Sequence, residues 1–196
     1  MLNKLQEDIA KRWTHSNSSA ANEYLSRHKS APFPNTDEGF VDLRGLCITQ
    51  FIKNSVVHRV DLSHASLEGF GQFGFCQISE TRFVGARLGT NLGNSFSRCE
   101  FKECNLSGAV LRGEFNDCDF SAAKMTSAIV NQATFRRCQF IRSVLRKSMF
   151  LHCQFEDCVF EGCTFGGGSI AGSSFVRSPL TANDLVNTVT ENTRFE

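Results

Sequence analysis

The nine cysteines are the residues of this sequence best suited to do chemistry. Thiolates bind soft metals, and pairs of thiols form disulfides. No Cys-x-x-Cys pair of the kind used by zinc sites occurs, and the closest cysteines are five residues apart. We therefore predict that eight of them are small buried packing residues, with no metal and no disulfide: Cys76, Cys99, Cys104, Cys118, Cys138, Cys153, Cys158 and Cys163.

A run of basic residues is the second candidate. Between Phe120 and Phe155 there is no acidic residue and there are six basic ones: Lys124, Arg136, Arg137, Arg142, Arg146 and Lys147. Phosphates of nucleic acids bind such residues, but a non-specific nucleic-acid binder has a strong basic excess. Here 21 Lys and Arg residues are balanced by 20 Asp and Glu residues.

Catalytic residues form no recognisable pattern. The five histidines are scattered, at His15, His28, His58, His64 and His152. The sequence contains no G-x-S-x-G, no P-loop and no H-E-x-x-H. The glycines at 166–168 are not followed by a Lys and are expected to let the chain turn tightly. We expect a protein that is not an enzyme and needs no cofactor.

The ends and the apolar content bear on localisation. The N-terminus, residues 1–8, is polar and lacks the apolar segment of a signal peptide. No stretch approaches the ~20 apolar residues of a membrane span. We expect a cytoplasmic protein with reduced thiols and no membrane contact.

A period of five residues organises the chain that carries these side chains. Every fifth residue from Phe115 to Phe195 is large and apolar, with Thr190 as the exception. The residue two positions earlier is always small or compact. This period matches neither a helix nor an ordinary strand, so one short unit recurs. The predicted core comprises Phe115, Phe120, Phe135, Phe140, Phe155, Phe160, Phe165 and Phe175.

Units such as Cys104-Asn-Leu-Ser-Gly108 and Cys118-Asp-Phe-Ser-Ala122 resemble the A-(D/N)-L-x-x unit of pentapeptide repeat proteins. The resemblance covers roughly residues 41–196 and implies an all-β solenoid, a right-handed quadrilateral β-helix with four units per coil. We therefore predict two parts: a helical N-terminal cap and loop, residues 1–36, and a pentapeptide-repeat β-helix, residues 37–196.

Four units per coil place residues twenty apart in one column. Cys99, Cys118, Cys138 and Cys158 then share a column, and Arg136 and Arg137 lie between Asp117 and the Glu156–Asp157 pair. Gly166 and Gly167 face Arg146 and Lys147, while Glu161 can face Arg142. This leaves Arg142, Arg146 and Lys147 as a candidate partner-binding patch. In the inward columns, Thr190 is the one polar core residue.

Three segments depart from the period. Leu2, Leu5, Ile9 and Trp13 form an apolar stripe at helical spacing, and Ser18 or Ser19 can cap a second helix bearing Ala21, Tyr24, Leu25 and His28. We expect these helices to cover the first coil, or alternatively to bind a partner. Around residues 51–55 we expect an irregular corner or loop, and around residues 69–75 a bend. The steps that are not five residues long touch one corner, which holds Phe73, Leu92 and Leu111.

The resemblance also suggests a function. The Cys-rich and Phe-rich units of Phe155–Phe165 look like the repeats of the quinolone-resistance (Qnr) and MfpA-type proteins, which engage DNA gyrase and topoisomerase IV. We predict a rigid scaffold that binds a protein. The alternatives are a type II topoisomerase partner, with antibiotic resistance, and nucleic-acid binding through the basic residues.

The repeat continues to the last residues, Phe195 and Glu196. An uncovered last coil exposes apolar side chains and backbone groups. We predict a homodimer formed end to end there, or a short folded-back tail.

Overall fold

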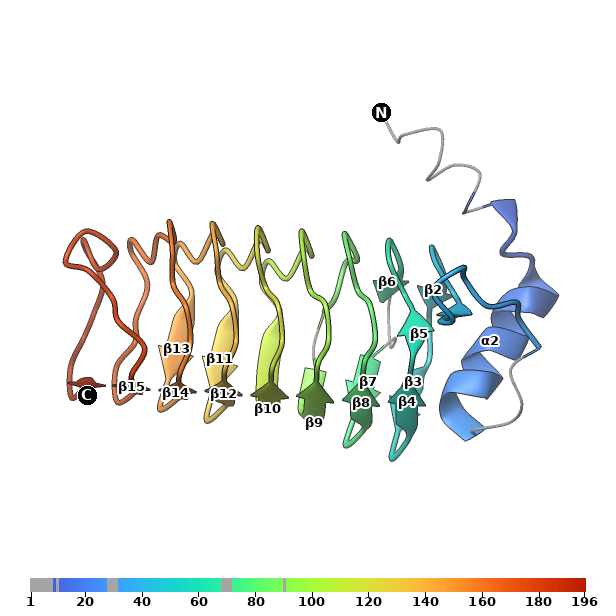
Figure 1. The fold of residues 1–196 in the computed structure, drawn as a ribbon, viewed down its shortest axis with the longest axis horizontal. Coiled ribbons are helices and arrows are strands. Elements are labelled where there is room, and N and C mark those ends of the chain that lie inside the picture. The colour runs from blue at the N-terminus through green and yellow to red at the C-terminus, as the bar shows by residue number, and fades with distance from the viewer. Residues whose placement is uncertain (1–8, 10, 28–31, 68–71, 90) are drawn as a thin grey trace.

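The computed structural model describes residues 9, 11–27, 32–67, 72–89 and 91–196. The described residues form a β-solenoid of about seven turns, with helix α2 near the N-terminal end (Figure 1). The predicted all-β solenoid is therefore confirmed. The helix α2 spans His15–Arg27.

Short parallel strands build the sides of the coils, and each pairs with at least one strand of a neighbouring coil. Their bounds are β1 Val41–Asp42, β2 Cys47–Ile48, β3 Phe51–Lys53, β4 Val56–His58, β5 Val60–Asp61, β6 Ser66–Leu67, β7 Gln72–Gly74, β8 Gln77–Ser79, β9 Asn91–Ser97, β10 Val110–Asn116, β11 Ile129–Asn131, β12 Thr134–Arg136, β13 Met149–Leu151, β14 Gln154–Glu156, β15 Ser174–Val176 and β16 Arg194–Phe195.

The register follows the predicted twenty-residue coil. Phe115 pairs with Phe135, Phe135 with Phe155, and Phe155 with Phe175. Their rings stack, with centroids 4.8, 4.9 and 4.6 Å apart. A second column, from Phe101 to Phe160, stacks in the same way and meets the first edge to face. All eight phenylalanines named for the core are buried.

The N-terminal coils keep this plan where we expected a break. Residues 51–55 are not an irregular loop: β3 and β4 lie on adjacent sides, with Ile52 and Val57 buried inside. Ile52 pairs with Phe73, and Val57 with Ile78. The inward residues Ile48 and Ile52 are four residues apart instead of five. The period is therefore interrupted in the sequence, although the coil continues.

The irregular steps do gather on one side of the solenoid. The pairing places Ile52 beside Phe73, and Leu111 beside Val130, on this side. The register between β9 and β10 shifts between Leu111 and Gly113. The segment from Gly69 to Gly71 lies outside the described residues, but Phe75 turns with a φ of 55° and is exposed.

The helix at the N-terminus starts earlier than predicted. The Oγ1 of Thr14 accepts a hydrogen bond from the Asn17 N–H, 3.3 Å away, so Thr14 caps the helix and Ser18 and Ser19 lie inside it. Trp13 precedes the helix, and its Nε1–H donates to the Arg44 carbonyl. Leu2, Leu5 and His28 lie outside the described residues.

Helix α2 packs over the first coil (Figure 1). Ala21 and Leu25 are buried in the same core cluster as the solenoid residues. The Ser55 hydroxyl donates to the Ser26 carbonyl, 3.1 Å away. The helix thus covers apolar surface that an open coil would expose. The boundary between residues 36 and 37 stays a prediction.

Arg12 ties the segment before α2 to the first coil. Its guanidinium donates to both carboxylate oxygens of Asp42, at 2.8 and 2.7 Å, and to the Arg44 carbonyl. Burial raises the pKa of Asp42, but hydrogen bonds from Arg12 and Arg44 outweigh it and hold that pKa well below its usual range.

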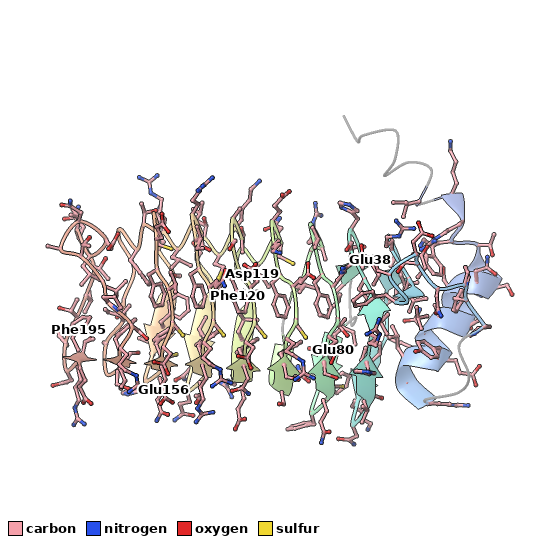
Figure 2. All side chains as sticks on the ribbon, in the orientation of Figure 1. Glu38, Glu80, Asp119, Phe120, Glu156 and Phe195 are labelled. Atoms are coloured by element: carbon pink, nitrogen blue, oxygen red, sulfur yellow. The ribbon has the colours of Figure 1, made fainter. Side chains whose placement is uncertain are left out.

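The last coil is more open than the others. Leu180 and Leu185 are half-buried. Phe195, labelled at the C-terminal end in Figure 2, is 51% exposed. Its ring nevertheless stacks on that of Phe175. Thr190, which we placed in the core, is exposed. Its position belongs to the inward series, but no following described coil lies over it.

Candidate partner-binding surface

The corners of the solenoid decide where the basic side chains point. At most corners the residue two after the inward residue adopts a positive φ, which is 55° at Arg142 and 58° at Lys147. This conformation turns the chain onto the next side of the coil. The side chains of Arg142, Arg146 and Lys147 are exposed.

Four basic residues share one surface. Val144 lies on the side between the corner at Arg142 and the corner at Arg146 and Lys147, and it pairs with Lys124 one coil earlier. We call Lys124, Arg142, Arg146 and Lys147 the basic face. The structure brings together the three predicted residues and adds Lys124, which the cross-coil bridge to Val144 identifies.

Among the described residues, no carboxylate oxygen forms an ion pair within 4.0 Å with a side-chain nitrogen of the basic face. The Arg142 N–H donates to the backbone carbonyl of Glu161, but their side chains form no ion pair. Lys147 lies over Gly167, where an added Cβ would sit 3.6 Å from the Lys147 Cγ. These cations are therefore available to an external anion.

Other arginines nearby are paired, as the twenty-residue coil predicted. Arg137 bonds Asp117, and Arg136 contacts Glu156 at 3.4 Å. They lie on or beside a corner column in which positive and negative residues alternate from coil to coil: Arg59, Glu80, Arg98, Asp117, Arg137, Asp157 and Arg177. Figure 2 shows Glu80 of this column and Glu156 beside it toward the same edge. The six basic residues of the run thus divide into paired and unpaired groups.

The cysteines occupy the interior. The eight predicted ones are buried. The Sγ atoms of seven of them contact backbone carbonyls of the preceding coil, as Cys138 does with Phe115 (3.3 Å) and Cys158 with Phe135 (3.4 Å), while that of Cys118 contacts the Asn116 carbonyl. Ser143 makes the equivalent bond to Phe120 (2.7 Å). The sequence analysis assigned the small residue two before each large inward residue by its size alone. It missed that this side chain also donates a hydrogen bond to a backbone carbonyl, although the recurrence of Cys and Ser at this position indicated a donor.

Burial suppresses the chemistry of two of these thiols. Burial raises the pKa of Cys153 to about 12 and that of Cys163 to about 11, so both thiols are protonated at neutral pH. Within the described ranges, no group of three or more His, Cys, Asp or Glu side chains is placed to hold a metal ion.

The described histidines lie apart from one another. The ring of His152 lies over Gly172, and that of His64 over Gly85, each against a glycine one coil later. His58 hydrogen-bonds the Ser79 hydroxyl at 2.9 Å. None of the described helices is long and apolar enough to span a membrane.

Comparison with known proteins fits this geometry. Residues 131–162 match the family model for pentapeptide repeats, in eight copies. These residues belong to coils in which four five-residue units return the chain to the same column. This segment is identified as pentapeptide repeats. No curated protein sequence matches the chain.

Several solved structures are similar to this chain. A trypsin-treated form of QnrB1, a plasmid-mediated fluoroquinolone resistance protein, is 19% identical, with 79% of this chain and 88% of that chain covered and a TM-score of 0.44. HetL of Nostoc sp. strain PCC 7120, involved in heterocyst differentiation regulation, is 14% identical, with coverages of 74% and 86% and a TM-score of 0.29. Rfr23 of Cyanothece 51142 is 11% identical, with coverages of 72% and 91% and a TM-score of 0.29.

Proposed function

We propose that this protein is a non-enzymatic, rigid β-helical scaffold that binds another protein through Arg142, Arg146 and Lys147. The observation that carries the proposal is the contrast between these unpaired cations and the paired Arg136, Arg137 and Arg177. Unpaired exposed charges speed association with an oppositely charged partner and exclude like-charged ones.

A capture experiment from the native host tests this proposal. The wild-type protein and the triple variant Arg142→Glu, Arg146→Glu, Lys147→Glu are immobilised, and bound proteins are compared by mass spectrometry. We expect a partner that the wild type retains and the variant loses. Identical sets of bound proteins would contradict the proposal.

A more specific version is binding to DNA gyrase or topoisomerase IV, with protection against their inhibitors. It is supported by the repeat style of Phe155–Phe165. A supercoiling assay with gyrase, with and without a quinolone, tests it. If this version holds, the protein changes either the activity or its inhibition; no effect on either removes this version and leaves the broader proposal standing.

End-to-end homodimerisation is also retained as a proposal. The half-exposed ring of Phe195 and the half-buried Leu180 and Leu185 support it, because a second copy would cover them. Light scattering of the wild type and of Phe195→Ser tests it. A wild type that is monomeric at all concentrations argues against the dimer.

A further inference from the structure

The basic face is bordered by exposed apolar side chains. Val144 lies between Arg142 and Arg146 in the chain, and Met149 follows Lys147 beyond the corner. Val144 and Met149 are 36% and 38% exposed, and Ile129, which pairs with Met149, is 37% exposed. We call Ile129, Val144 and Met149 the apolar border. A cationic surface with apolar residues beside it offers two kinds of contact at once.

Building on the proposed function, we infer that the partner contributes an acidic segment with apolar side chains, and that this segment lies across the basic face and the apolar border. Carboxylates of the segment pair with Lys124, Arg142, Arg146 and Lys147. Its apolar side chains cover Val144 and Met149, which supplies the desolvated contact that charge pairs alone lack.

The neighbouring coil leaves room for such a segment. Gly166 and Gly167 lie one coil after Arg146 and Lys147, whereas Thr126, Ser127, Val186 and Asn187 carry side chains at the same corner of other coils. The Lys147 N–H donates to the Gly166 carbonyl at 3.1 Å. This hydrogen bond holds the two glycines, which have no side chains, next to the basic face. A bound chain can therefore approach the solenoid backbone there.

The composition of the surface favours a protein over a nucleic acid. Proteins that bind single strands stack bases on aromatic side chains, and neither the basic face nor the apolar border contains an aromatic residue. Binding to duplex DNA relies on many phosphate contacts, and the basic face provides four cations.

Selection from a phage-displayed library of random short peptides tests the inference. Wild-type protein is compared with Arg142→Glu/Arg146→Glu and with the matched double reversal Lys53→Glu/Arg112→Glu. Lys53 and Arg112 are exposed, form no ion pair among the described residues and lie at a different corner. We expect acidic peptides with apolar residues from the wild type and the matched control, and not from Arg142→Glu/Arg146→Glu.

Affinities of one selected peptide then separate the two kinds of contact. We expect reversal of Arg142 and Arg146 to weaken binding about tenfold or more. Val144→Ser/Met149→Ser should weaken it severalfold, whereas Phe51→Ser, at the equivalent outward position near the N-terminal end, should leave it unchanged. Circular dichroism and thermal melting establish that each variant folds.

Three results would overturn the inference: selected peptides without acidic residues, equal selection by Arg142→Glu/Arg146→Glu, or an affinity insensitive to Val144→Ser/Met149→Ser. Displacement of the peptide by an oligonucleotide at equal or lower concentration would also overturn it, in favour of a nucleic acid. The proposed function survives these failures if the host partner still depends on Arg142, Arg146 and Lys147. It fails separately if no such partner is captured.

Discussion

The guanidinium of Arg137 donates hydrogen bonds of 2.6 and 2.9 Å to the two carboxylate oxygens of Asp117, one coil earlier. The same pair of hydrogen bonds recurs two coils further along the column, from Arg177 to the two carboxylate oxygens of Asp157, at 2.6 and 2.9 Å. Because stacked coils bring equivalent positions side by side, alternation of charge along the column makes every neighbour attractive.

Reversing one charge of this column should destabilise the protein slightly. Asp117→Lys places a cation between Arg98 and Arg137, so attraction becomes repulsion on both sides. These side chains are exposed, and we expect a small fall in melting temperature that shrinks in concentrated salt. Asp117→Asn, which only removes the attraction, should have a smaller effect. An equal effect at low and high salt would contradict the electrostatic explanation.

Removing a ring from the stacked core should be far more costly. Phe155 is fully buried between Phe135 and Phe175. We expect Phe155→Ala to lower the free energy of unfolding by about 3–5 kcal/mol, measured by urea denaturation. Phe75→Asn serves as the control, since Phe75 is 67% exposed with a positive φ that Asn tolerates. Similar losses from both substitutions would contradict the assignment of the core.

Two neighbouring glycines should respond differently to alanine. A Cβ at Gly168 would lie 2.3 Å from the Ser148 carbonyl oxygen, whereas a Cβ at Gly166 has its nearest neighbour at 3.6 Å. We expect Gly168→Ala to cost about 1–3 kcal/mol in urea unfolding, because backbone must move. Gly166→Ala should change stability by less than about 0.5 kcal/mol. A larger loss of stability in Gly166→Ala than in Gly168→Ala would show that the inward position of Gly168 tolerates a methyl group.

Acid should release the N-terminal cap. The depressed pKa of Asp42 means that its contribution to stability is present above the unfolded pKa near 4 and is lost as the pH falls through the lower folded value. The protection factors of the α2 amides against hydrogen exchange should therefore fall on acidification before those of β12 and β14. In Arg12→Ala, α2 should exchange faster already at neutral pH. Unchanged α2 protection in this variant would show that Arg12 does not hold the cap.

Alkali should weaken the interior. Since the pKa values of Cys153 and Cys163 are raised, these thiols stay protonated in the folded protein while those of the unfolded chain ionise. Stability is thus complete below the unfolded pKa near 9 and falls as the pH rises from there toward about 11 and 12. Cys153→Ser should flatten this dependence. An identical pH profile in wild type and Cys153→Ser would refute this origin.

Much of the interior could be predicted from the period of five. Phe115, Phe135 and Phe155 recur at twenty residues, and a coil can enclose only one large side chain per unit, so the column follows from spacing and volume. The prediction failed at Ile52 and Val57 because a four-residue step interrupts the count while the coil continues. The predicted start of the helix was wrong because Ser18 and Ser19 are, from the sequence alone, as suitable as Thr14 to cap a helix.

The amino-acid sequence by itself determined the repeat, the inward columns, the buried cysteines and the partners available to Arg136 and Arg137, because all depend on periodic spacing. Only the tertiary structure decided which side chains meet outside the coil. Lys124 joined Val144 through a bridge between coils, Glu161 offered Arg142 a backbone carbonyl rather than its carboxylate, and Thr190 became exposed. The reason is physical: the interior admits one arrangement of volumes, whereas outward side chains take directions set by neighbours about twenty residues away.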